Sequence, residues 1–251
     1  MRKLLHVIVM VFLLLPKGPK AQTIINTATI SHDLDSTISF VVDLAGNFSR
    51  GNLSVDDLGG SLGLGVSLNE DQSIWILAGG NVLNTQGEQV QEGAFSHLRH
   101  NWEITPSMTL QTFAQVQMNT ALDFNRRSLI GSTIGYDLDK EGQSFIGLGS
   151  FWEDEIYGLS PKASGLRGNA MIASEWSGDK VEWLVLVYYQ PYLSDFQDYR
   201  AILNSDFRVN LTSDIQLGTS ISSRFDSKPH SGLFPWDFSL LTTLRYSFHR
   251  S

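Results

Sequence analysis

The sequence predicts an all-β protein, an antiparallel up-and-down transmembrane β-barrel of about twelve strands, with ten strands as the alternative. We call each set of alternate residues along a strand a parity. Between residues 108 and 119, the even-numbered parity carries apolar and small side chains, whereas the odd-numbered parity carries three glutamines. Alternate residues of a strand point to opposite faces, so this segment would form a strand with one apolar and one polar face. The alternation recurs almost to the end of the chain. Repeated alternating segments of about ten residues, separated by turn residues, are the signature of a transmembrane β-barrel.

Twelve segments show the alternation and are expected to be strands. They are 38–47, 58–69, 73–83, 94–104, 108–119, 126–138, 143–157, 167–176, 181–190, 200–211, 215–226 and 237–248. Short polar turns alternate along the chain with longer links near 48–57, 84–93, 120–125, 158–166, 191–199 and 227–236. This is typical of a barrel with tight turns at one end and loops at the other, and it gives an even number of strands.

The first 21 residues have the features of an export signal. Arg2 and Lys3 precede an apolar run that ends at Leu15, and a polar exit leads to a cleavage position after Ala21. The apolar run is too short for a membrane-spanning helix, which needs about twenty residues. We therefore expect a signal peptide at 1–21, an N-terminal extension at 22–36 and a barrel at 37–251. The expected location is the outer membrane of a Gram-negative envelope.

The final strand, 238–248, carries Phe238, Tyr246 and Phe248 on its apolar parity. A C-terminal strand that ends in alternating aromatics resembles the signal read by the barrel-assembly machinery. We expect that machinery and outer-membrane lipid as partners. In the usual signal the phenylalanine is the last residue, whereas here three residues follow Phe248. Amphipathic rings gather at membrane interfaces, and five tryptophans near strand ends are expected there: Trp75, Trp102, Trp152, Trp176 and Trp183.

The composition excludes several classes of function. The chain has no cysteine, so it forms no disulfide and offers no thiolate to a metal. Its formal charge is −8, and removing the four basic residues of the predicted signal leaves 14 basic against 26 acidic residues, a charge of −12. A surface of this sign argues against nucleic acid as a partner, although its loops would attract cations. No cofactor and no metal centre are expected.

If the apolar parity faces lipid, the other parity faces the lumen. The lumen-lining candidates are Arg99, Gln111, Gln115, Gln117, Arg127, Glu153, Glu155, Arg167, Arg200, Arg208, Arg224, Asp226 and Arg245, together with Glu175, Glu182 and Asp206. A charge on the lipid face would cost about 2–4 kcal/mol near the midplane, which supports the assignment. Seven arginines meet six acids in this set. Two interpretations remain open: ion pairs that plug a narrow lumen, or a lumen that conducts small solutes or cations.

Catalysis has little support, and we expect no enzyme. An outer-membrane lipid hydrolase needs a histidine beside a nucleophilic serine. The only His-x-Ser spacing is at 249–251, and His230-Ser231 falls in a loop with proline and glycine. His97 is expected to join Arg99 and Asn101 in a polar cluster. A lipid-modifying enzyme that uses His97 or Ser231 is the remote alternative for the function, and a soluble ligand-binding barrel is the alternative for the fold.

Six short runs carry a family resemblance. They are His97-Leu98-Arg99-His100-Asn101, Phe113-Ala114-Gln115-Val116-Gln117, Arg127-Ser128-Leu129-Ile130-Gly131, Glu153-Asp154-Glu155, Tyr189-Gln190-Pro191 and Asp198-Tyr199-Arg200. In this order they resemble the YdiY-like family of salt-induced outer-membrane proteins, a domain of unknown function, over roughly residues 90–250. The resemblance implies an outer-membrane barrel and brings no substrate or catalytic residue. The expected function is a barrel of undefined role, related to envelope or salt stress, with a narrow or plugged lumen. A porin-like channel for small solutes is the alternative.

Overall fold

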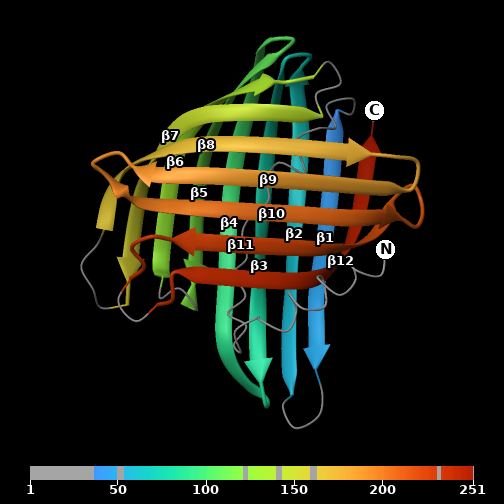
Figure 1. The fold of residues 1–251 in the computed structure, drawn as a ribbon. Helices are drawn as coiled ribbons and strands as arrows, with labels where there is room; N and C mark the ends of the chain where they lie inside the picture. The colour runs from blue at the N-terminus through green and yellow to red at the C-terminus, as the bar shows by residue number, and fades with distance from the viewer. Residues whose placement is uncertain are drawn as a thin grey trace, which may run out of the picture.

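Twelve antiparallel strands close into a barrel in the computed structural model, which describes residues 37–49, 54–120, 124–139, 143–158, 163–230 and 233–250 (Figure 1). The strands are β1 (Ile38–Ser49), β2 (Val55–Asn69), β3 (Gln72–Thr85), β4 (Glu88–Thr105), β5 (Met108–Asn119), β6 (Phe124–Asp137), β7 (Ser144–Tyr157), β8 (Ala163–Ser177), β9 (Val181–Tyr192), β10 (Asp195–Asn210), β11 (Ile215–Asp226) and β12 (Trp236–Arg250). Each strand pairs with its neighbours along the chain, and β1 pairs with β12 to complete the ring. The predicted twelve-stranded up-and-down barrel is confirmed. The predicted signal peptide and the extension at 22–36 lie outside the described residues.

The strands are strongly tilted, as closure of a sheet into a barrel requires. In Figure 1, β9 to β11 cross the front of the barrel at a steep angle to β2 to β4 behind them. Ile38 is paired with Arg250, so the barrel begins and ends at the same rim. We call this rim the terminal end and the opposite rim the loop end.

Within the described residues, no helix has the length and apolar character needed to cross a membrane.

Strands extend into most of the predicted long links, and the links expected at 84–93 and 191–199 are wrong. β3 and β4 leave only the turn Gln86-Gly87, where both φ angles are positive, at 54° and 85°. Positive φ at both central positions gives a hairpin turn whose twist matches that of its strands. β9 and β10 are likewise joined across 193–194. In both places the paired strands continue beyond their predicted ends.

The outward face of the barrel is apolar along its middle. Ile130 and Leu148 are 64% and 67% exposed, and Ile130 lies between Ala114 and Trp152 of the adjacent strands. Four of the tryptophans expected at the interfaces lie on this face: Trp102, Trp152, Trp176 and Trp183. A continuous apolar exterior is what contact with lipid requires.

Trp75 is the fifth of these tryptophans, and its assignment to an interface is wrong. Its side chain is 3% exposed and packs inside the barrel with Leu77 and Phe95. A second apolar cluster, formed by Phe145, Met171, Ala173 and Leu186, also lies inside. The interior is therefore partly filled with apolar side chains, which an assignment of polar residues to the lumen did not anticipate.

Room for the Trp75 ring comes from Gly65, which lies directly opposite on β2. A Cβ atom at Gly65 would stand 2.5 Å from the ring of Trp75. Gly65→Ala is expected to lower the free energy of unfolding by about 1–3 kcal/mol, the usual cost of overpacking. Urea titration of the refolded protein measures this. Gly135→Ala is the control, because a Cβ there meets its neighbours at 3.7 Å or more; equal unfolding midpoints for the two variants would contradict the prediction.

Candidate functional site in the barrel lumen

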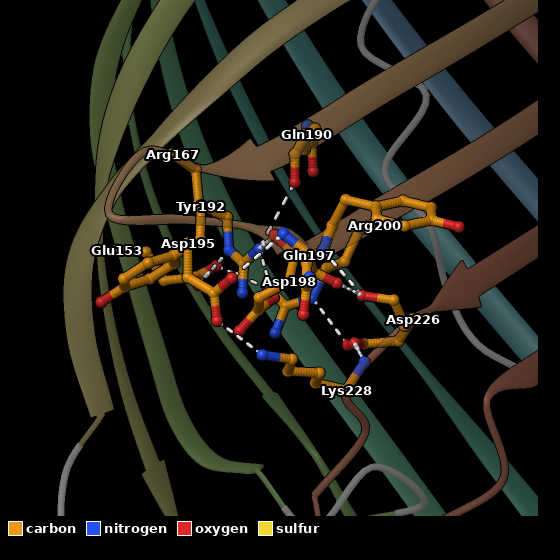
Figure 2. A network of polar contacts seen from close by, with 12 residues as sticks. Glu153, Arg167, Gln190, Tyr192, Asp195, Gln197, Asp198, Arg200, Asp226 and Lys228 are labelled. Carbon is orange, nitrogen blue, oxygen red and sulfur yellow. Dashed lines mark hydrogen bonds and ion pairs between the residues drawn. The ribbon is translucent and has the colours of Figure 1, made fainter.

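A network of buried ion pairs, part of which is drawn in Figure 2, lies inside the barrel near the loop end and includes Glu153. Glu153 is 2% exposed, and its carboxylate accepts hydrogen bonds from Arg127, Arg167 and Arg200 at 2.5, 2.6 and 2.6 Å. These arginines come from β6, β8 and β10, whereas Glu153 lies on β7. Alternation along each strand aims all four side chains inward, so residues far apart in the chain meet around one carboxylate.

Further carboxylates balance the arginines. Arg200 contacts Glu155 at 3.0 Å and Asp226 at 2.8 Å. Three more pairs extend the contacts: Arg127 with Glu155 at 2.9 Å, Arg167 with Asp198 at 2.9 Å and Arg224 with Asp226 at 3.3 Å. We call these eight residues, which lie on β6 to β8, β10 and β11, the loop-end network. It contains four arginines and four acids, and such balance offsets the desolvation that buried charges would otherwise suffer.

The segment after β11 makes contacts beside this network. The Lys228 ammonium donates a hydrogen bond to Asp195 at 2.5 Å, and this bond raises the pKa of Lys228 above its usual value. The His230 ring stacks on Tyr157 of β7, with the ring centroids 4.3 Å apart. Tyr157 in turn donates a hydrogen bond to Glu155. The link from β11 to β12 therefore reaches across to β7 at the loop end.

A second, smaller group of charges lies toward the terminal end. Arg245 of β12 donates two hydrogen bonds to Asp43 of β1, at 2.6 and 2.8 Å, across the seam that closes the barrel. Arg208 lies 3.7 Å from Asp206, and Gln216 donates to Glu182 at 2.7 Å. Gln216 thus joins β11 to β9, and Arg245 joins β12 to β1.

A cavity of about 120 Å³ lies beside the loop-end network inside the barrel. It is lined by His97, Arg99, Gln111, Phe113, Gln115, Gln117, Arg127, Leu129, Thr133, Phe151, Asn169, Met171, Tyr188, Gln190, Ile202 and Arg224. This volume is large enough to hold water or a small solute. The lining combines amides and guanidinium groups with aromatic rings, so it offers a small molecule both hydrogen-bonding groups and apolar surface.

One wall of this cavity is ordered by a short chain of hydrogen bonds. His97 Nδ1 and Gln115 Oε1 are 3.0 Å apart, and an amide oxygen only accepts, so Nδ1 carries the proton. Gln115 Nε2 then donates to Gln117 Oε1 at 2.7 Å. The Phe113 ring stacks on His97, with centroids 5.9 Å apart. This chain leaves the amide NH₂ of Gln117 as its last donor.

The structure distributes the predicted lumen residues over these three regions. The loop-end network holds Arg127, Glu153, Glu155, Arg167, Arg200, Arg224 and Asp226, and the cavity holds Arg99, Gln111, Gln115 and Gln117 together with Arg127 and Arg224. The terminal-end group holds Glu182, Asp206, Arg208 and Arg245. Glu175 is half-buried on β8, near its turn to β9.

Sequence reasoning missed several members of the site. Asp198 lies in a segment expected to be loop, and Asp43 meets Arg245 only once the barrel closes. Tyr157 shares the parity of Glu153 and Glu155, and that parity was the available signal for it. Within the Glu153-Asp154-Glu155 run, Glu153 and Glu155 share the inward face and both pair with Arg127, whereas Asp154 points the other way, toward Arg126 at 3.7 Å.

The arrangement around the histidines bears on the hydrolase alternative. His97 contacts Gln115 and Phe113, and the hydrogen bonds of its ring within the described residues involve no serine. Asn101, expected beside His97, instead donates to Ser73 at 3.4 Å. His230 stacks on Tyr157, and Ser231 lies outside the described residues.

A closed antiparallel barrel with an apolar exterior and a charged interior has the architecture of outer-membrane barrel proteins. Solved structures of that class share the fold. The NanC porin matches with 10% identity and a TM-score of 0.52, over 84% of this chain and 99% of that one. The translocator domain of the autotransporter NalP from Neisseria meningitidis matches with 12% identity and a TM-score of 0.54, over 88% and 91%.

Residues 42–248 match the model of the family described as "Protein of unknown function, DUF481", and the chain belongs to that family. This agrees with the resemblance carried by the six sequence runs. A search of curated proteins finds no match to the chain.

Proposed function

We propose that the protein resides in the outer membrane as a barrel whose lumen is closed at rest by its own side chains. The expected consequence is little or no free diffusion of solutes through the unmodified protein. A role in envelope or salt stress rests on the family resemblance alone.

The observation that carries this proposal is the set of contacts made by Arg200. Its guanidinium is 3% exposed and joins Glu153 and Glu155 of β7 to Asp226 of β11. Three strands separate β7 from β11 along the wall, so these contacts run through the interior rather than along one hairpin. Selective pores carry rings of one sign at their constrictions, whereas here both signs pair off.

A second candidate, a narrow channel for small solutes, is favoured by the central cavity. A lumen built only as a plug would be packed along its length, as protein interiors are. Here a polar space large enough to hold water lies beside the loop-end network. In this second candidate function, the loop-end network acts as a gate, and the cavity is a binding site along the permeation pathway.

Single-channel recording in planar bilayers tests the proposal. The unmodified protein is expected to give no steps or rare small ones. The double variant Glu153→Gln/Arg200→Gln removes one charge of each sign and leaves Arg127–Glu155, Arg167–Asp198 and Arg224–Asp226 as balanced pairs. It is expected to give frequent, larger steps, because the centre of the closure is lost while the remaining charges stay paired.

The control is Arg126→Gln/Asp154→Gln, which likewise removes one charge of each sign but from the outward parity, on β6 and β7. This variant should conduct like the unmodified protein. Large, continuously open channels in the unmodified protein would refute closure at rest. A folded double variant with no conductance would rule out the loop-end network as a gate and leave a permanently plugged barrel.

A further inference from the structure

We infer that the central cavity is a binding site for a small organic anion, a carboxylate that also bears a hydroxyl group. This deepens the second candidate function by naming the class of solute. Size sets the first limit, because a cavity of about 120 Å³ admits a hydroxy acid of a few carbon atoms and excludes an oligosaccharide. Burial inside the barrel excludes a macromolecule.

The charged residues that line the cavity predict an anionic ligand. Three arginines line the cavity, namely Arg99, Arg127 and Arg224, and its lining within the described residues includes no aspartate or glutamate. The acids that pair with Arg127 and Arg224 belong to the loop-end network and lie outside the cavity lining. A guanidinium binds a carboxylate through two parallel hydrogen bonds, and a site with low water content strengthens such bonds.

Arg99 is the cation that distinguishes this site from the network. It lies on β4, where the residues directly opposite are Trp75 of β3 and Phe113 of β5. Its surroundings across the sheet are therefore aromatic, and its side chain is buried at 7% exposure. Arg99 thus presents a positive charge to the cavity from the wall opposite Arg224 of β11.

The side-chain carboxamides in the cavity are suited to bind the hydroxyl group of the ligand. Gln117 ends the hydrogen-bond chain from His97 with its NH₂ group still available, because its oxygen accepts the bond from Gln115. Gln111 lines the cavity, and its side chain makes no hydrogen bond within the described part of the chain. Carboxamides both donate and accept, which suits a hydroxyl group that does the same. On the far wall, Gln190 donates to Asn169 at 3.1 Å and keeps its own oxygen as an acceptor.

Calorimetric titration of the detergent-refolded protein with lactate tests the inference, because binding is measured without any need for conduction. Propane-1,2-diol is the neutral analogue of lactate, and chloride is the simple anion. Lactate should bind saturably. The diol and chloride should bind at least about tenfold more weakly, since a charge-assisted hydrogen bond contributes about 1.5–3 kcal/mol.

Two variants locate the binding. Arg99→Gln should weaken lactate binding at least about tenfold, whereas Arg126→Gln, which removes the same charge from the outward parity, should leave it unchanged. Gln111→Glu places a carboxylate in the cavity and should abolish binding while leaving every arginine in place. Absence of lactate binding, equal binding of the diol, or equal binding of chloride would each overturn the inference. Lactate binding to a barrel that never conducts would uphold it while refuting the channel.

Discussion

Replacing Glu153 with glutamine is expected to lower the free energy of unfolding by about 3–5 kcal/mol, the cost typical of breaking a buried ion pair by removing one partner. Glu153 accepts from three arginines, and no other carboxylate of the loop-end network contacts all three. The variant would leave four arginines facing three acids inside the barrel. The effect should appear as a lower urea midpoint for the protein refolded into detergent or lipid.

Glu175→Gln is the matched control, because Glu175 also lies on the lumen parity and makes no ion pair within the described residues. Its substitution should change the free energy of unfolding by no more than about 0.5 kcal/mol. Adding Arg200→Gln to Glu153→Gln should recover part of the lost stability, since residues of one network couple in this way. If Glu153→Gln and Glu175→Gln were equally mild, Glu153 would not hold the network together.

Together with the conductance measurement, this stability test distinguishes a permanent plug from a gate. The network contains equal numbers of both charges, so its arrangement alone is compatible with a permanent plug and with a gate. Loss of stability without a gain of conductance identifies Glu153 as part of a structural plug. Loss of stability with a gain of conductance shows that the same contacts also block the path.

The fold could be predicted from the sequence because most strands have lipid on one side and a charged interior on the other. Apolar and polar residues therefore alternate along them with a period of two. Register follows from that period, since a shift by one residue would exchange the two faces. Trp75 is an exception, because alternation did not predict its place in the barrel. Residues 74–77 of β3 are all apolar, so alternation did not separate the two faces there, and the chemistry of the ring suggested an interface. The position of Gly65 across the sheet explains its burial.

The candidate site could be predicted only as a set of inward residues. Alternation along the strands placed both Arg99 and Glu153 inside the barrel. It did not predict that Arg99 lines a cavity or that three arginines surround Glu153. That division depends on which strands face each other across the closed barrel. Asp43 and Arg245 are separated by most of the chain and become partners only at the seam between β1 and β12.

Replacing Ile130 with arginine is expected to prevent most of the protein from folding into lipid vesicles. Ile130 is exposed on the outward face between Ala114 and Trp152, so the guanidinium would have to enter the hydrocarbon. Arginine on the lipid face costs about 2–4 kcal/mol near the midplane, and the loss of the isoleucine side chain adds to this cost. The folded fraction is measured by the difference in gel mobility between heated and unheated samples.

Ser61→Arg is the control, because it places the same side chain on the inward parity of β2, away from the three arginines of the cavity. Ser61 lies directly opposite Asp43 of β1, so the new arginine meets a carboxylate. This variant should fold into vesicles nearly as well as the unmodified protein. If both variants folded equally well, the surface around Ile130 would not contact lipid, and the outer-membrane location would have to be abandoned. A large difference between them would instead establish which face of the wall meets the membrane.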